Sequence, residues 1–345
     1  MLADDVCYVI GVDTHADSHA LVLVEARTLR TCRSVTIAAT RSGYRRALRL
    51  VCRQAPGQRV WALEGCGSYG AGLARFLTTR GERVLEVERP RREGRRGRCK
   101  SDALDAERAA RQLLAGEAGA RPRLEARTQA LRVLLVARES AVCERTAALN
   151  QLRALLLGAP PQLRERLQGC SQRALVEACT RLRGGRDSER AALCLALRSL
   201  ARRIARLRVE ANELEAELAG RVQALAPDLL ARRGVGPICA AWLLTGWSEP
   251  GRVRSEAAFA RLAGVAPIPA SSGRIVRYRL DRGGDRRLNR ALHTIALALR
   301  RTDAETQAYI ARRVSEGKTE REAIRCLKRY LARSLFRLLE ATTPA

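Results

Sequence analysis

The stretch RPRREGRRGRCKSDALDAERAARQ, residues 89–112, joins a run of arginines to two aspartates that stand three residues apart. A helix that begins near Ser101 would place the carboxylates of Asp102 and Asp105 on one face. Arginine side chains bind phosphate, which carboxylates repel. The combination is consistent if a divalent metal ion bridges the carboxylates to a phosphate. We therefore expect nucleic-acid backbone contacts from the preceding cations Arg95, Arg96, Arg98 and Lys100.

Two further carboxylates follow apolar segments that have the composition of buried strands. Asp13 ends VCYVIGVD, residues 6–13, and Glu64 lies near the end of RVWALEG, residues 59–65. A carboxylate at the end of a strand lies at the rim of the sheet, where a ligand can reach it. Oxygen donors suit Mg²⁺ or Mn²⁺ better than Zn²⁺, and two such ions about 3.5–4 Å apart can hold both sides of a phosphodiester. Taken singly, each acid could be a cap or a surface residue: Asp102 could cap its helix, and Asp17 could equally be the acid near the first strand. As a set, Asp13, Glu64, Asp102 and Asp105 predict a Mg²⁺ or Mn²⁺ site.

Histidine and serine pairs offer further chemistry. His15 and His19 are four residues apart, but a strand and turn surround them, so we expect structural or solvent-facing roles. Ser271 and Ser272 lie in PASSGRIVRYR, and a serine hydroxyl becomes a nucleophile only when its surroundings activate it. Nearby arginines would neutralise an attacked phosphate, although on spacing alone a Ser/Gly turn between helices is the better explanation of the pair. The arginines concerned are Arg274, Arg277 and Arg279.

The first 120 residues alternate predicted strands and helices around the four carboxylates. Apolar, β-branched runs predict strands, and apolar residues at helical spacing predict helices. This order predicts a mixed sheet with helices on its faces. The expected strands are 6–13, 19–25, 34–39, 59–65 and 83–87, and the expected helices are 44–53, 69–81 and about 101–115.

The middle of the chain carries a heptad pattern. Apolar residues recur at alternating steps of four and three, which is typical of a coiled coil or a long helical hairpin. A helix over about 126–157 is expected to pack against this seam. The pattern fits pairing with a second chain, which we favour, and also an ordinary helix pair within one chain. The seam consists of Leu193, Leu197, Leu200, Ile204, Leu207, Ala211, Leu214 and Leu218.

A third region begins at about residue 226. The segment LLARRGVGPICAAWLL has the glycine, turn and helix order of a helix-hairpin-helix, whose turn offers backbone N–H groups to phosphate. A basic helix, EREAIRCLKRYLARSLFRLLEA, lies near the C-terminus. The predicted organisation is an α/β catalytic domain over 1–120, a helical coiled-coil region over 121–225, and a mainly α domain over 226–345.

Composition restricts the partners and the cellular location. The net charge of +28 and a pI near 11.2 indicate a polyanionic partner, with nucleic acid first and an acidic membrane surface second. No apolar run reaches the roughly 18 residues of a membrane span, and no signal peptide is recognisable at the N-terminus. The 11 cysteines include no CxxC pair, which favours a reducing cytosol over a disulfide framework. We therefore expect a cytoplasmic protein that does not enter the membrane.

Taken together, the motifs resemble the DEDD transposases of bacterial insertion sequences, the group related to the Piv invertase. GVDTHADSHALVL, ALEGCGSYGAGLARFL and KSDALDAERAAR are similar to their RuvC-like, RNase H-type N-terminal domain. FARLAGVAPIPASSG and RGGDRRLNRALH are similar to their C-terminal transposase domain. The resemblance implies that Ser272, next to Ser271, is the catalytic serine. It also implies catalytic roles for Asp13, Glu64, Asp102 and Asp105.

The resemblance further implies a mechanism and partners. The serine would join the 5′-phosphate of DNA, and each active site would combine domains of two subunits in a dimer or tetramer. A structured bridge RNA would select donor and target DNA, and the protein would associate with the bacterial nucleoid. Two alternatives stay open: a RuvC-like structure-specific nuclease or resolvase that uses water, and a non-enzymatic basic nucleic-acid-binding protein.

Overall fold

The computed structural model describes residues 5–87, 101–116, 119–184, 188–269, 278–279 and 281–341. These residues divide between two compact units, Met1–Glu125 with Gly251–Val253, and Ala126–Pro250 with Arg254–Ala345. Of the predicted nucleic-acid contacts, only Arg279 lies among the described residues. The residues outside them are Arg95, Arg96, Arg98, Lys100, Ser271, Ser272, Arg274 and Arg277.

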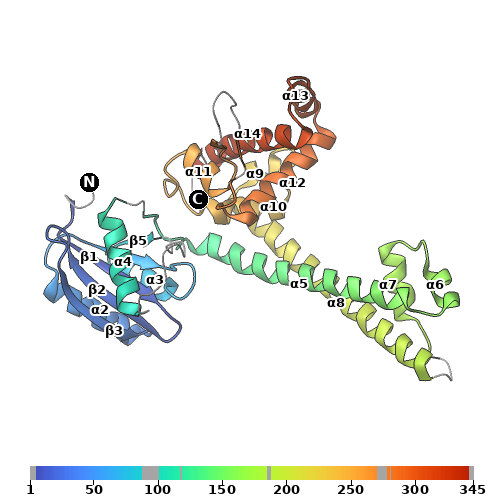
Figure 1. The fold of residues 1–345 in the computed structure, drawn as a ribbon, viewed down its shortest axis with the longest axis horizontal. Coiled ribbons are helices and arrows are strands. Elements are labelled where there is room, and N and C mark those ends of the chain that lie inside the picture. Colours follow the sequence, from blue (N-terminus) through green and yellow to red (C-terminus); the bar gives the residue numbers. More distant parts are fainter. Residues whose placement is uncertain are drawn as a thin grey trace. The chain divides into compact units, whose positions relative to one another are not determined.

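A five-stranded mixed sheet forms the first unit (Figure 1), as the sequence predicts. Its strand order is β3-β2-β1-β4-β5. The pairs β1–β2 and β2–β3 are antiparallel, whereas β1–β4 and β4–β5 are parallel. A meander followed by parallel strands fits the RNase H-like expectation. The strands are β1 Tyr8–Thr14, β2 Ser18–Glu25, β3 Thr31–Ala38, β4 Arg59–Glu64 and β5 Arg83–Val87.

Helices cover both faces of this sheet. On one face, α2 (Arg41–Gln54) and α3 (Ala71–Thr78) cover a core that includes Trp61. On the other face, α4 (Asp102–Leu114) covers a second core through Ala106 and other small residues. Because the central strands are buried on both sides, their sequences are almost continuously apolar.

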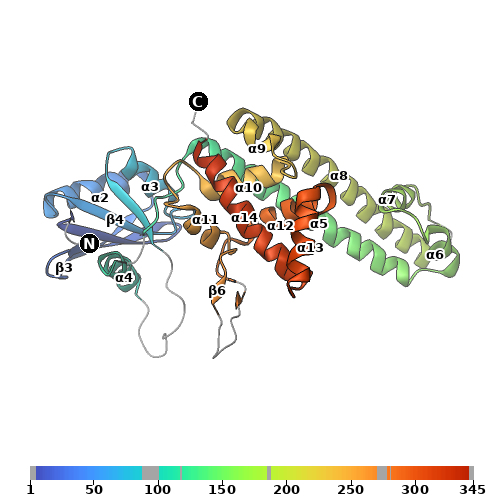
Figure 2. The ribbon, with the colours of Figure 1, turned by 90° about the horizontal axis from the view of Figure 1, so that it is seen from above.

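The second unit is helical and contains a long hairpin, in which α5 (Ala126–Leu157) lies beside α8 (Ser188–Leu225) in Figures 1 and 2. Ion pairs Arg138–Glu215 and Arg203–Glu144 show that the two helices are antiparallel. Two short helices, α6 (Pro161–Leu167) and α7 (Gln172–Thr180), lie between them in the chain.

Every position of the predicted heptad seam is buried or half-buried in the chain itself. The four residues Leu197, Ile204, Ala211 and Leu218 are fully buried, and α5 is the principal neighbour of this helix. The structure therefore matches the alternative of a helix pair within one chain. The seam has a partner within its own chain, so its apolar stripe is no longer a reason to expect a second chain.

The rest of the second unit is built around α10 (Pro237–Trp247). All its residues from Cys239 to Trp247 are buried, which a helix that is apolar on all sides requires. This helix packs against α5, α8 and two later helices. The domain boundary predicted at 225/226 therefore lies inside one compact unit. The division into three domains stays a prediction. The other elements are α9 Pro227–Ala231, α11 Glu256–Leu262, β6 Ile268–Pro269, β7 Tyr278–Arg279, α12 Arg286–Thr302, α13 Ala304–Ser315 and α14 Glu320–Ala341. None of the helices in the described ranges combines the length and apolarity that crossing a bilayer requires.

Candidate active site

A buried carboxylate and a histidine meet at the end of β1. Asp13 is only 4% exposed. The backbone N–H of His15 donates to the carbonyl of Ser18 at 3.0 Å, which starts the turn between β1 and β2. In this position the His15 ring lies with Nε2 3.1 Å from Oδ2 of Asp13 and 3.4 Å from Oδ1 of Asp102. His15 therefore lies between two carboxylates that are far apart in the sequence.

The close approach of α4 to β1 places Asp102 there. A Cβ on Gly11 would overlap with the carbonyl oxygen of Ala106, so only glycine allows this contact between helix and strand. Asp102 lies one helical turn before Ala106 and so on the side of the helix that faces the sheet. Ser101 is the N-cap, and its carbonyl accepts from Asp105 N at 3.1 Å. Asp102 is thus the first helical residue and does not cap the helix.

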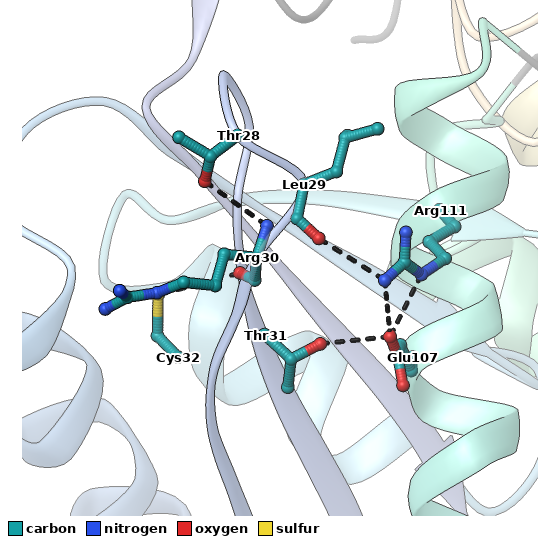
Figure 3. Close-up of polar contacts among 7 residues, drawn as sticks. All are labelled: Thr28, Leu29, Arg30, Thr31, Cys32, Glu107 and Arg111. Carbon is teal, nitrogen blue, oxygen red and sulfur yellow. Dashed lines mark hydrogen bonds and ion pairs between the residues drawn. The ribbon is translucent and has the colours of Figure 1, made fainter.

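Farther along α4, polar contacts attach the helix to the turn between β2 and β3 (Figure 3). Thr31 Oγ1 donates to Glu107 Oε1 at 3.0 Å, and Arg111 Nη2 donates both to Glu107 and to the carbonyl of Leu29. The Arg111 guanidinium lowers the pKa of the Glu107 carboxyl. Leu29 has a φ of 58°, which turns its carbonyl toward the helix at the cost of backbone strain. These contacts fix the orientation of the helix that carries Asp102 and Asp105.

The other two predicted acids lie near this cluster in the fold but outside it. Val12 pairs with Leu63 in the parallel register, so Asp13 and Glu64 are the next residues on neighbouring strands. Thr14 Oγ1 donates to the Glu64 carbonyl at 2.8 Å and joins the two strand ends. Asp105 forms an ion pair with Arg108 at 2.7 Å. Within the described part of the chain, only Asp13, His15 and Asp102 offer ligand atoms that all lie within 4.8 Å of one another.

The donor spacing of this cluster suits a hard divalent ion. Neighbouring ligands in an octahedron with bonds of about 2.1 Å stand about 3 Å apart. The distances of 3.1 and 3.4 Å around His15 Nε2 are close to that value. An imidazole beside two carboxylates suits Mn²⁺ better than Mg²⁺. Glu64 follows Leu63 on the strand beside Asp13, and Asp105 lies three residues after Asp102 on α4. Sequence reasoning expected no metal role for His15, although its position two residues after a strand-end aspartate is a usable signal.

The region around the serine pair begins and ends in a small antiparallel ribbon. Ile268 pairs with Arg279, and Pro269 pairs with Tyr278, so β6 and β7 flank the segment that contains Ser271 and Ser272. Arg279 is exposed on β7.

A partly buried polar network connects the chain segments next to this ribbon. Lys328 Nζ donates to Asn289 Oδ1 at 2.7 Å, and Asn289 Nδ2 donates to the carbonyls of Ala263 and Gly264 at 2.7 and 3.1 Å. A Cβ on Gly284 would overlap with the backbone of Gly264, so the two chain segments touch at this point. Burial lowers the pKa of the Lys328 ammonium. The network holds together the segments that lead into β6 and away from β7.

Comparisons with known families match both parts of the chain. The family model DEDD_Tnp_IS110, described as a transposase, matches residues 10–161. A second model, described as the transposase IS116/IS110/IS902 family, matches residues 228–311. The first match contains all four predicted acids, and the second contains the serine pair.

Two curated relatives are similar to part of the chain. An insertion element IS110 uncharacterized 43.6 kDa protein of Streptomyces coelicolor is 32% identical over 148 residues, which are 42% of this chain and 36% of the relative. An insertion element IS900 uncharacterized 42 kDa protein of Mycobacterium paratuberculosis is 34% identical over 113 residues, which are 32% of this chain and 28% of the relative. The matched region thus spans about a third of the length of each relative.

Proposed function

Because this chain belongs to the IS110 family of DEDD transposases, we propose that it is a DNA transposase that cuts and rejoins strands of an insertion sequence. The observation that carries the proposal is the meeting of Asp13, His15 and Asp102 at the end of β1. A buried carboxylate in a protein with a net charge of +28 is suited to hold a metal against a phosphate.

The proposed metal ligands are Asp13, Glu64, Asp102 and Asp105, to which the geometry adds His15. A divalent ion bound there would neutralise charge on a scissile phosphate and polarise its oxygens. The chain's own part is to hold the donors in place, through the contact of Gly11 with α4 and through the attachment of α4 to the β2–β3 turn.

Ser272 is the proposed nucleophile. Its Oγ would form a bond to phosphorus while the bond from phosphorus to the DNA 3′-oxygen breaks, and the 3′-oxygen would leave with a proton. A 3′-hydroxyl of a second strand would then attack, break the Ser272–phosphorus bond and return the proton to the serine. Each step exchanges one phosphodiester for another, so rejoining needs no nucleotide hydrolysis. Arg274, Arg277 and Arg279 are proposed to neutralise the phosphate.

The proposed partners follow from the family. They are donor and target DNA, a structured bridge RNA that selects both, and further copies of this chain in a dimer or tetramer. In that arrangement the acidic site of one subunit works with the serine of another. Arg95, Arg96, Arg98 and Lys100 are proposed to hold the nucleic-acid backbone beside the acidic site. The proposed location is the bacterial cytoplasm, at the nucleoid.

Changing Asp102 to Asn tests the metal site. The change keeps the size of the side chain and removes the charge that the ion needs, so strand cleavage should fall by at least about 100-fold while DNA binding is unchanged. Cleavage of a labelled duplex with Mg²⁺ and with Mn²⁺ measures the first effect, and a binding assay in EDTA measures the second. Asp228→Asn, on α9 in the other unit, is the matched control. Full cleavage by the Asp102 variant would rule out this site. Binding without cleavage by the wild type would instead favour the non-enzymatic DNA-binding alternative.

A further inference from the structure

The solvent face of α2 carries an unusual concentration of positive charge. The helix spans 14 residues, contains five arginines and has no acidic residue. All five arginines are exposed, whereas the opposite side of the helix is buried through Gly43, Ala47 and Val51. The row consists of Arg41, Arg45, Arg46, Arg49 and Arg53.

The spacing of the row is regular. Four of its members follow one another at intervals of four residues, so they form one ridge with about 6 Å between successive positions along the helix axis. Within the described residues, none of the five forms an ion pair. On α4 and α8, by contrast, acidic residues share the helix, and some arginines pair with them, as in Arg111–Glu107 and Arg221–Glu217. The charge of α2 is therefore not compensated on its own surface.

The helix is a rigid support for these side chains. Thr40 caps its first turn by accepting from Gly43 N at 3.2 Å, and a Cβ on Gly43 would overlap with the carbonyl of Ala38 in β3. One turn later, the Tyr44 ring stacks on His19 with centroids 5.8 Å apart. Because the backbone is already fixed, a ligand that binds the row orders only the arginine side chains.

Like charges at this density repel one another, and that cost is recovered when a polyanion lies along them. We propose that the α2 row binds the phosphate backbone of duplex DNA at a position separate from the acidic site. The occupant rests on the proposed function, because DNA is the polyanion that a transposase must hold. The row lies on the α2 and α3 face of the sheet, whereas Asp102 belongs to the helix on the opposite face. A strand in the acidic site therefore does not also lie along α2, and the row binds another segment of duplex.

The test compares two triple variants that remove the same charge. Arg41→Gln, Arg45→Gln and Arg49→Gln together remove unpaired arginines from the row. Arg181→Gln, Arg203→Gln and Arg221→Gln together remove exposed arginines that are ion-paired with Glu177, Glu144 and Glu217. Binding of a labelled duplex is measured in EDTA at several salt concentrations, and a structured RNA of the same length is measured in parallel.

The row variant should bind duplex DNA at least about tenfold more weakly, with a salt slope shallower by about 0.9 for each phosphate that the protein no longer neutralises. The paired variant should stay close to the wild type. An unchanged slope in the row variant, an equal weakening in the paired variant, or a weakening confined to RNA would each overturn the proposal. The binding assay contains EDTA and does not depend on cleavage. If the protein never cuts DNA, the proposed transposase activity is contradicted, but the binding result for the arginine row still stands.

Discussion

At the scale of single residues, His15 is the main addition that the structure makes. Of the two carboxylates that His15 contacts, Asp13 is two residues away in the sequence, but Asp102 lies on a helix 87 positions later. No periodicity within a short window can bring such residues together. The placement of Asp13 and Glu64 at the ends of strands and of Asp102 at the start of a helix follows from local sequence patterns. The function of the four acids as a set stays a proposal.

Removing the imidazole of His15 tests its part in the metal site. His15→Asn should weaken binding of Mn²⁺ by about 10–100-fold, because the ring either coordinates the ion or orients both carboxylates. Calorimetric titration of the DNA-free protein with Mn²⁺ measures this directly, without any need for catalysis. His293→Asn, an exposed histidine on α12, serves as the control and should bind Mn²⁺ like the wild type. Equal affinity in the His15 variant would show that the ring is only a hydrogen-bonding neighbour of Asp13.

At the scale of elements, the strands and long helices follow from the sequence, and their ends follow less closely. The expected helix over 126–157 coincides with α5, because the GAPP sequence that follows ends the helix at its C-terminus. In contrast, α2 begins at Arg41 and not at residue 44, since the capping threonine precedes a polar first turn that carries no apolar periodicity. The β6–β7 ribbon has only two residues in each strand and gives no pattern at all.

The contact between α4 and β1 gives a sharp prediction at this scale. Gly11→Ala should destabilise the first unit by at least about 1–3 kcal/mol, because the new Cβ would overlap with a backbone carbonyl that cannot rotate away. Thermal unfolding followed by circular dichroism measures the change. The same substitution at Gly220, a helical position with open space around it, should instead stabilise the protein by up to about 1 kcal/mol. A Gly11 variant as stable as the wild type would mean that α4 does not lie against this strand.

At the scale of the whole molecule, the packing around α10 is the property that the sequence indicates least. The division into three domains stays a prediction, and in the structure both the helical hairpin and the C-terminal helices pack against α10 within one compact unit. Nothing in the sequence of α10 says which helices will surround it, since it is apolar on every side. The heptad seam posed the same difficulty, because an a/d pattern fits a helix of the same chain as well as one of another chain.

Charged substitutions in the seam distinguish packing within one chain from pairing between two chains. Ile204→Asp with Leu207→Asp places charge where α5 of the same chain packs, so the second unit should lose helical content and its melting temperature should fall. Circular dichroism and light scattering on one sample measure fold and particle mass together. Val209→Asp, on an exposed position of the same helix, should change neither. A smaller particle with an unchanged melting temperature would show that the seam joins subunits instead.

The most direct test of the proposed transposase is to trap its covalent link to DNA. A substrate nicked near the cleavage site lets the released strand diffuse away, so the protein–DNA link cannot be reversed. The wild type with Mg²⁺ should give complexes that survive denaturation and map to the peptide that contains Ser272.

Ser272→Ala should abolish these complexes, Ser271→Ala should only reduce them, and Asp102→Asn should also abolish them. A Ser271 variant that is inactive, with Ser272→Ala still active, would move the nucleophile by one residue. If both serine variants still trap DNA, or if the wild type cuts without any trapped product, the serine mechanism is wrong and the water-using nuclease replaces it.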